Sequence, residues 1–147
     1  MARILLAEDD EIMRITLYDR LIGLGYEVDQ EGNGRDALAR IADNAYHLII
    51  SDIKMPGMDG IKLLEHSKRI SPDSDVILMT AYGSVEDAIT CLKKGATDYV
   101  LKPFDMDDLT IRVSRILANQ QIKAKCLSLE EGARDKKLVG SSSTMIA

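Results

Sequence analysis

The sequence predicts an α/β fold in which a doubly wound, five-stranded parallel sheet is covered by five helices. Two observations predict it. Short apolar runs alternate with amphipathic stretches, and the first, third and fourth runs are nearly continuous in apolar residues, as in strands buried on both faces of a parallel sheet. Five successive βα units imply right-handed crossovers. The expected strands cover residues 3–8, 26–30, 46–51, 75–80 and 98–102.

Helices are expected between these strands, where apolar residues recur at helical spacing. The first places five apolar residues near one another around the helix: Ile12, Ile15, Leu17, Leu21 and Ile22. Glycines just beyond a periodic stretch are typical helix ends. The expected helices cover 11–23, 34–44, 59–70, a stretch that closes at Gly95, and a last, long stretch that opens at Asp105.

Composition limits the classes of protein that fit. The 147 residues are 46% hydrophobic, enough for one ordinary domain with a sizeable core. The formal net charge of −5 argues against non-specific binding of nucleic acid. The two cysteines, Cys91 and Cys126, lack metal-like spacing and fit a reducing compartment. No apolar run approaches a membrane span, and "MARILLAEDD" becomes acidic too early for a signal peptide. We therefore expect a cytoplasmic protein without a membrane partner.

The C-terminal part of the chain differs from the rest. From about residue 119 the sequence is polar and charged, and a heptad spacing runs through positions 111, 115, 118, 122, 125 and 129. This pattern predicts either a weak coiled-coil seam or a solvated helical linker, and both readings stay open. We expect the helix to end at Gly132.

Carboxylates stand where two of the expected strands end. Asp52 follows the third strand, and Glu8 and Asp9 end the first. Sites in a doubly wound sheet form beyond the carboxyl ends of its strands, so we expect these three side chains to converge, whereas Asp10 can point elsewhere. Like charges are unfavourable together without a cation. Oxygen ligands favour Mg²⁺, so the sequence predicts a magnesium site; the alternative is an acidic surface without an ion.

Two further strand ends complete a site for a phosphoryl group. Thr80 ends the fourth strand, and Lys102, before Pro103, ends the fifth. A hydroxyl and an ammonium can hold phosphoryl oxygens. Asp52 can then act as a nucleophile and form an aspartyl-phosphate, with Mg²⁺ neutralising the charge. The tight loop "KMPGMDG" lets the backbone carbonyl of Lys54 reach the metal.

Four stretches, "ILLAEDDE", "SDIKMPGMDG", "MTAYG" and "DYVLKPF", occur in the order and spacing of a known family. Residues 3 to about 119 resemble the receiver domain of two-component response regulators. The resemblance implies a flavodoxin-like sheet with strand order 2-1-3-4-5. It also implies roles for individual residues. Glu8 and Asp9 are then the metal-binding acidic pair, with Glu8 in place of the commoner aspartate, and Lys54 gives its backbone carbonyl to the metal. Asp52 is the phosphoacceptor, and Lys102 is the phosphate-binding lysine. Thr80 is the switch hydroxyl, and Tyr99 is the switch aromatic.

A second resemblance concerns the C-terminal residues and a subclass of the family. "LVGSSSTM", at 138–145, resembles the opening of the AAA+ domain in sigma-54-dependent activators, and "MTAYGSVEDAI" is similar to the nitrogen-regulation subclass. The resemblance implies a receiver domain at 1–119, a helical linker at 120–137, and the start of a truncated AAA+ domain at 138–147. No Walker loop or helix-turn-helix is evident, so we expect this chain neither to hydrolyse ATP nor to bind DNA.

The expected function is that of a phosphorylation-dependent switch rather than an enzyme. A sensor histidine kinase would phosphorylate Asp52 with Mg²⁺, and homodimerisation through the 84–119 face or the 105–131 helix would change. Self-phosphorylation from small donors and autodephosphorylation would be its only chemistry. Two alternatives are an interaction module that works without phosphorylation and a Mg²⁺-dependent aspartyl-phosphate phosphatase. The phosphatase class usually has a second carboxylate two residues after the nucleophile, where this chain has Lys54.

Overall fold

The computed structural model describes residues 2–81, 83 and 85–137, and the side chains of all of these except 85 and 123–137. The strands are β1 (Arg3–Ala7), β2 (Glu27–Glu31), β3 (Leu48–Asp52), β4 (Asp75–Thr80) and β5 (Asp98–Leu101). The helices are α1 (Glu11–Gly23), α2 (Gly34–Asp43), α3 (Gly60–Ile70), α4 (Val85–Lys93) and α5 (Met106–Lys137). The chain divides into two compact units, residues 1–110 and 111–147, which are described separately.

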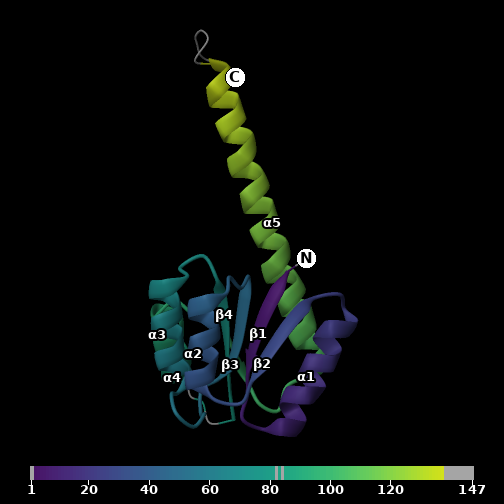
Figure 1. Ribbon diagram of the computed structural model, residues 1–147, viewed down its shortest axis with the longest axis vertical. Helices are drawn as coiled ribbons and strands as arrows, with labels where there is room; N and C mark the ends of the chain where they lie inside the picture. Colours follow the sequence, from purple (N-terminus) through teal and green to yellow (C-terminus); the bar gives the residue numbers. More distant parts are fainter. Residues whose placement is uncertain (1, 82, 84, 138–147) are drawn as a thin grey trace. The chain divides into compact units, whose positions relative to one another are not determined.

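The first unit holds a five-stranded parallel sheet in the order β2-β1-β3-β4-β5, which confirms the predicted fold class and strand order. Helix α1 lies on one face of the sheet, and α2, α3 and α4 lie on the other (Figure 1). Because every strand is parallel, all carboxyl ends meet at one edge. The register near that edge pairs Ala7 with Ser51, Asp52 with Met79, and Thr80 with Leu101.

The burial of the strands follows their position in the sheet. Every residue of the central strand β3 is buried, and β1 and β4 are buried apart from their first residues. The outer strands β2 and β5 are only partly buried. This is the distribution that near-continuous and mixed apolar runs predict for central and edge strands.

The core has two layers because successive strand residues point to opposite faces of the sheet. Residues such as Ile4, Leu6 and Ile50 point to the face that α1 covers, where Leu17 and Leu21 are also buried. Full burial of one such side chain contributes about 2 kcal/mol. The layer under α2, α3 and α4 consists of Leu5, Ala7, Ala37, Ile41, Tyr46, Ile49, Leu63, Leu64, Val76, Leu78, Cys91 and Ala96.

Three helices begin beside the carboxyl edge with a side-chain cap. Asp10 accepts hydrogen bonds from the backbone N–H groups of Ile12 (3.1 Å) and Met13 (3.3 Å). Asn33 and Asp59 cap α2 and α3 in the same way, each over 2.8 Å. The carboxylate of Asp10 therefore serves the start of α1, in agreement with the expectation that it points away from the other acids.

Helix α1 has the expected bounds, 11–23. Of its five apolar residues at helical spacing, Leu17 and Leu21 are buried, whereas Ile12, Ile15 and Ile22 are exposed, so the buried stripe is narrower than the apolar one. The expected helix end at Gly132 was wrong. Helix α5 continues through Gly132 to Lys137, because one glycine inside a helix costs only about 1 kcal/mol.

The second unit consists of the helical residues 111–137 in the described part of the chain. The coiled-coil or linker function of this helix stays a prediction, as do the boundaries at 119 and 137. The expected start of an AAA+ domain at 138–147 lies outside the described residues. Within residues 2–81, 83 and 85–137, no helix has the length and apolar character of a membrane span.

Candidate phosphoacceptor site

Three carboxylates meet where β1 and β3 end. Asp52 is the last residue of β3 and is 7% exposed, while Glu8 follows β1 and is fully buried. Asp9 is exposed at the rim. One carboxylate oxygen from each residue lies within 4.8 Å of the other two. The structure thus brings together the three acids that the sequence predicts at one edge of the sheet.

Lys102, which directly follows β5, contacts two of these acids with its side chain. Its ammonium donates to Glu8 Oε1 over 2.5 Å and to Asp52 Oδ2 over 2.9 Å. Its backbone N–H donates to the carbonyl of Thr80 over 2.8 Å, and the peptide bond between Lys102 and Pro103 is cis. The lysine therefore lies against the carboxylate of Asp52, the predicted phosphoacceptor, where an ammonium could contact the oxygens of a phosphoryl group.

Burial and charge act in opposition at this cluster. Burial raises the pKa of Glu8 to about 7, although the hydrogen bond from Lys102 lowers it. Burial by itself lowers the pKa of Lys102, but its hydrogen bonds to Glu8 and Asp52 outweigh burial and raise it above the ordinary value. Lys102 thus keeps its charge, and its one ammonium binds two of the three clustered carboxyl groups. The set is rich in oxygen ligands and short of positive charge, which fits a hard divalent cation such as Mg²⁺.

The loop 53–59 follows directly after Asp52. The backbone N–H of Lys54 lies 3.4 Å from Asp52 Oδ1, and Gly57 has a φ of 85°, a conformation that favours glycine. Gly60 then starts α3 against the back of β3, with its N–H bonded to the carbonyl of Ile53 over 2.8 Å. The loop therefore turns tightly beside Asp52, with the backbone N–H of Lys54 directed at Asp52 Oδ1.

Thr80 and Tyr99 lie on the β4–β5 side of the site. Thr80 ends β4 and is 2% exposed. Tyr99 is paired with Leu78, and its hydroxyl is buried without a hydrogen-bond partner in the described part of the chain. A Cβ on Gly83 would collide with this hydroxyl and lie 3.1 Å from Thr80 Cγ2. The backbone at Gly83 therefore packs against both of the predicted switch side chains, Thr80 and Tyr99.

One residue behind the site was not predicted from sequence. The guanidinium of Arg14, in α1, donates through Nη1 to the backbone carbonyl of Glu8 and through Nε to Gln30 Oε1, each over 3.0 Å. Arg14 thereby ties the residue that follows β1 to β2 and α1. The available signal was its position three residues before Leu17, since residues three apart share one side of a helix.

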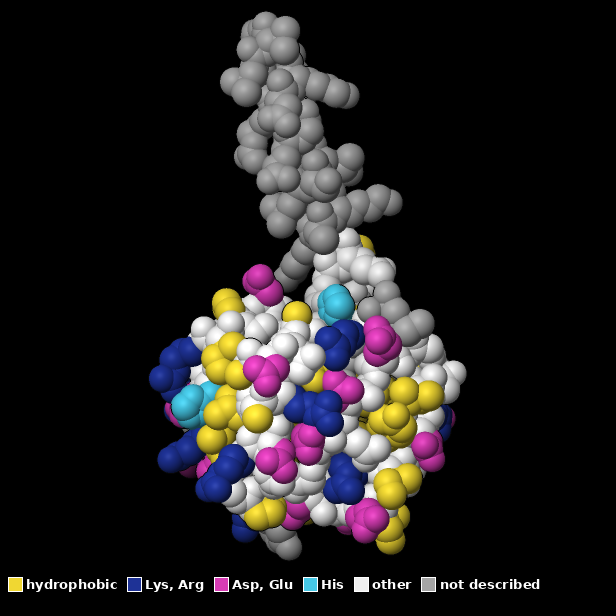
Figure 2. Space-filling model, in the orientation of Figure 1, with side chains coloured by type: hydrophobic (Ala, Val, Ile, Leu, Met, Phe, Trp, Pro, Cys, Tyr) yellow, Lys and Arg dark blue, Asp and Glu magenta, His cyan; other side chains and the backbone are white. Residues whose placement is uncertain are grey.

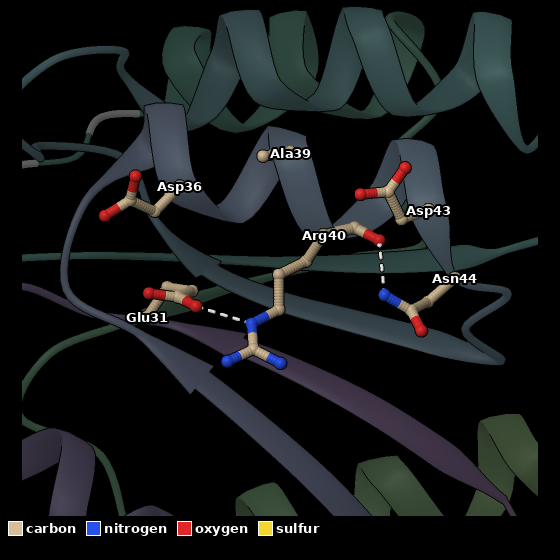
Figure 3. A pocket seen from close by; sticks show the side chains of 6 residues that line it. All are labelled: Glu31, Asp36, Ala39, Arg40, Asp43 and Asn44. Carbon is tan, nitrogen blue, oxygen red and sulfur yellow. Dashed lines mark hydrogen bonds and ion pairs between the residues drawn. The ribbon is translucent and has the colours of Figure 1, made fainter.

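A polar groove lies along α2 and the end of β2, lined by other residues than the three acids (Figure 3). Arg40 Nε donates to Glu31 Oε2 over 2.5 Å there, and Asn44 Nδ2 donates to the carbonyl of Arg40 over 3.1 Å. On the face of the molecule drawn in Figure 2, acidic and basic side chains are interspersed. Glu31, Arg40 and Asn44 thus have partners within the fold, and we assign the groove no chemistry.

Comparison with known proteins identifies relatives among transcriptional regulators. Residues 4–114 match the response regulator receiver domain family. The chain is 38% identical over 144 residues to the transcriptional regulatory protein ZraR of Klebsiella oxytoca, covering 97% of this chain and 32% of ZraR. It is 33% identical over 138 residues to the DNA-binding transcriptional regulator NtrC of Salmonella typhimurium, covering 94% and 29%. The chain thus spans about a third of the length of these relatives.

Solved structures give the same result. A CheY-like receiver domain from Methanospirillum hungatei matches with a TM-score of 0.80 and 32% identity, covering 84% of this chain and 98% of that one. NtrX from Brucella abortus matches with a TM-score of 0.79 and 31% identity, covering 87% and 29%. The resemblance to the nitrogen-regulation subclass of sigma-54-dependent activators is confirmed by these relatives. The chain belongs to the family of response regulator receiver domains.

Proposed function

We propose that Asp52 accepts a phosphoryl group from a sensor histidine kinase and that this event switches the domain between two states. The observation that carries the proposal is the position of Lys102, whose ammonium binds the buried carboxylates of both Glu8 and Asp52. An ammonium in contact with the acceptor is in reach of the oxygens that phosphorylation adds there. The site thus has a nucleophile and a stabilising charge side by side.

In the proposed reaction an oxygen of Asp52 forms a bond to phosphorus as the bond to the donor's imidazole nitrogen breaks. The electron pair of that bond leaves with the donor. Lys102 and the hydroxyl of Thr80 stabilise the phosphoryl oxygens, and the N–H of Lys54 orients the acceptor carboxylate. Mg²⁺, when held by Glu8, Asp9, Asp52 and the carbonyl of Lys54, would supply neutralisation of the phosphoryl charge.

The response to phosphorylation would pass through Thr80 and Tyr99 to the 84–119 face. Among the described residues of the first unit, this face has three large hydrophobic side chains that are about half exposed, Ile89, Leu92 and Leu101. Exposed apolar side chains that lie near one another favour association with another protein. A beryllofluoride-activated receiver domain of NtrC4, solved as a dimer, matches this chain with a TM-score of 0.77, 32% identity, and coverage of 82% of this chain and 99% of that one. We propose homodimerisation through this face, or through the 105–131 helix, as the output.

The relatives support a proposal for the physiological setting. The domain would act in the cytoplasm and control a sigma-54-type activator, while this chain itself would bind neither nucleic acid nor membrane. In such an arrangement the domain is a phosphoacceptor and not an enzyme. The local charge change on Asp52 would bias a two-state element that the downstream domain senses.

Intact-mass measurement after incubation with acetyl phosphate tests the chemistry. Wild-type protein and Asp73→Asn, which alters an exposed aspartate, should gain one phosphoryl group only with Mg²⁺ present, and Asp52→Asn should gain none. No gain by wild-type protein from either acetyl phosphate or a phosphorylated kinase would contradict the proposal and favour a module that works without phosphorylation. Sustained turnover of a phosphomonoester would favour the phosphatase alternative.

A further inference from the structure

The first residue of α2 lies directly against the loop that follows the acceptor. Gly34 is buried, and its backbone N–H donates to the carbonyl of Pro56 over 3.3 Å. A Cβ at position 34 would overlap the carbonyl oxygen of Met58 and lie 2.8 Å from both its carbonyl carbon and its Cβ. Real Cβ atoms essentially never approach other atoms within 3.0 Å. A side chain at position 34 therefore fits only if the backbone of the loop or of α2 moves, which changes the distance between them.

The helix itself does not require a glycine there. The cap of α2 is Asn33, whose side chain accepts from the N–H of Asp36 over 2.8 Å. Gly34 also has no left-handed backbone conformation of the kind seen at Gly57. An alanine is favoured over glycine inside a helix by about 1 kcal/mol. Local helix energetics would thus prefer alanine, and the close approach of Met58 is what demands glycine.

The loop cannot absorb a displacement at its C-terminal end. Gly60 is fixed by its hydrogen bond to the carbonyl of Ile53, and a Cβ on Gly60 would lie 2.9 Å from Ile53 Cα. Met55 and Met58 also pack against the buried core. A push at Met58 is therefore transmitted toward Lys54, whose N–H faces Asp52 Oδ1 and whose carbonyl is the predicted metal ligand.

We propose that Gly34 is a positioning residue for the phosphoacceptor site: its missing side chain lets α2 hold the loop 53–59 at the distance that phosphoryl transfer and Mg²⁺ binding require. The inference deepens the proposed function and rests on it for the phosphorylation readout. A displacement of about 1 Å at a reacting centre can reduce a rate about 100-fold. Position 34 thus influences the acceptor without contacting it.

The test compares Gly34→Ala with Gly23→Ala. Gly23 ends α1, has no atom within 4 Å of a Cβ and no left-handed backbone, so it is a matched control for the loss of a glycine. We expect Gly34→Ala to lower the rate of phosphorylation from acetyl phosphate at saturating Mg²⁺ by at least about 10-fold. Calorimetry should show weaker Mg²⁺ binding, and backbone amide resonances of 53–58 should shift. Gly23→Ala should leave all three readouts unchanged.

Unchanged Mg²⁺ affinity and loop resonances in folded Gly34→Ala would overturn the inference. Should the variant fail to fold, hydrogen exchange in wild-type protein decides: exchange at the Gly34 amide should slow when Mg²⁺ is added, relative to the Ala37 amide, which is bonded to the carbonyl of Asn33 within α2. An equal response at both amides would contradict the coupling. If wild-type protein accepts no phosphoryl group, the proposed function fails, whereas Mg²⁺ binding and the loop resonances still decide the role of Gly34.

Discussion

A tyrosine hydroxyl is buried near each lateral end of the sheet, and the two differ in hydrogen bonding. We call these ends the β2 side and the β5 side. On the β2 side, the hydroxyl of Tyr46 donates to Asp29 over 2.5 Å, and Asp29 also pairs with Arg3 (3.1 Å) and Arg40 (3.6 Å). On the β5 side, the hydroxyl of Tyr99 is buried without a partner among the residues that the structure describes. The tyrosine hydroxyl on the β2 side therefore has its hydrogen bond in this conformation. The hydroxyl on the β5 side could gain a hydrogen bond in another conformation.

The energetic difference between these two sides is large enough to matter. A buried polar group without a hydrogen bond costs about 1–3 kcal/mol. The same side of the sheet also exposes Ile89, Leu92 and Leu101. An unpaired buried hydroxyl near exposed apolar side chains suits the β5 side to a change between two conformations. The ion pairs of Asp29 instead favour a single conformation on the β2 side.

The largest expected effect comes from breaking the β2-side network. Asp29→Ala leaves the buried hydroxyl of Tyr46 unpaired and removes one ion-pair partner from each of two arginines, so we expect a loss of about 3 kcal/mol in the free energy of unfolding. Urea denaturation measures it. Asp29→Asn keeps an acceptor oxygen and should lose less than half as much. Equal losses in the two variants would contradict the role of the tyrosine hydrogen bond.

The next effect is a pH dependence. Burial, followed by the hydrogen bond to Asp29, raises the pKa of Tyr46 to about 12 from an ordinary 10.0. Because the folded-state pKa is the higher one, this stabilisation is complete below pH 10 and is lost as the pH rises to about 12. The difference in unfolding free energy between wild type and Tyr46→Phe should therefore fall by on the order of 2 kcal/mol over that range. Tyr18→Phe controls for the loss of a tyrosine hydroxyl, and a constant difference would refute the prediction.

A smaller effect of opposite sign is expected at Tyr99. Tyr99→Phe removes a buried hydroxyl that has no partner among the described residues, so the unfolding free energy should rise by about 1 kcal/mol. Thermal or urea unfolding beside Tyr46→Phe, which should destabilise the protein, gives the contrast directly. Destabilisation of both variants would show that the two sides of the sheet do not differ in this respect.

The smallest expected effect on stability is at the exposed end of β5. Leu101 is 52% exposed, so Leu101→Ala should change the unfolding free energy by less than about 0.5 kcal/mol. The same change should raise the dissociation constant of the phosphorylated dimer about fivefold if this face is the interface, as sedimentation would measure. Ile70→Ala, at a 48% exposed residue of α3, is the matched control. Equal dimerisation of all three proteins would exclude Leu101 from the interface.

Much of the fold could be predicted because parallel strands leave a strong pattern in the sequence. The central strands are continuous apolar runs, and their topology places every strand end at one edge, which brought Glu8, Asp9 and Asp52 together. The periodicity of α1 did not predict the exposure of Ile12 and Ile15, since spacing defines a direction and not the width of the covering sheet. Only the packed backbone shows that width.

The unpredicted parts of the site depend on distances between elements remote in the sequence. The contact of Arg14 with the carbonyl of Glu8 depends on how closely α1 approaches β1. The need for glycine at position 34 depends on the approach of α2 to the loop after β3. Neither residue belongs to a chemical motif at a strand end. A sequence pattern shows which residue types occur at which spacing. The roles of Arg14 and Gly34 depend instead on distances between packed elements, which the pattern does not contain.

The bridge from Lys102 to Glu8 and Asp52 has a consequence for biosynthesis. Its two hydrogen bonds join residues 94 and 50 positions apart in the chain. A nascent chain that has released β1 to β4 from the ribosome already contains Asp52, but it lacks the ammonium of Lys102. Under the proposed function, the ability to accept a phosphoryl group would therefore arise only after β5 has emerged and paired with β4.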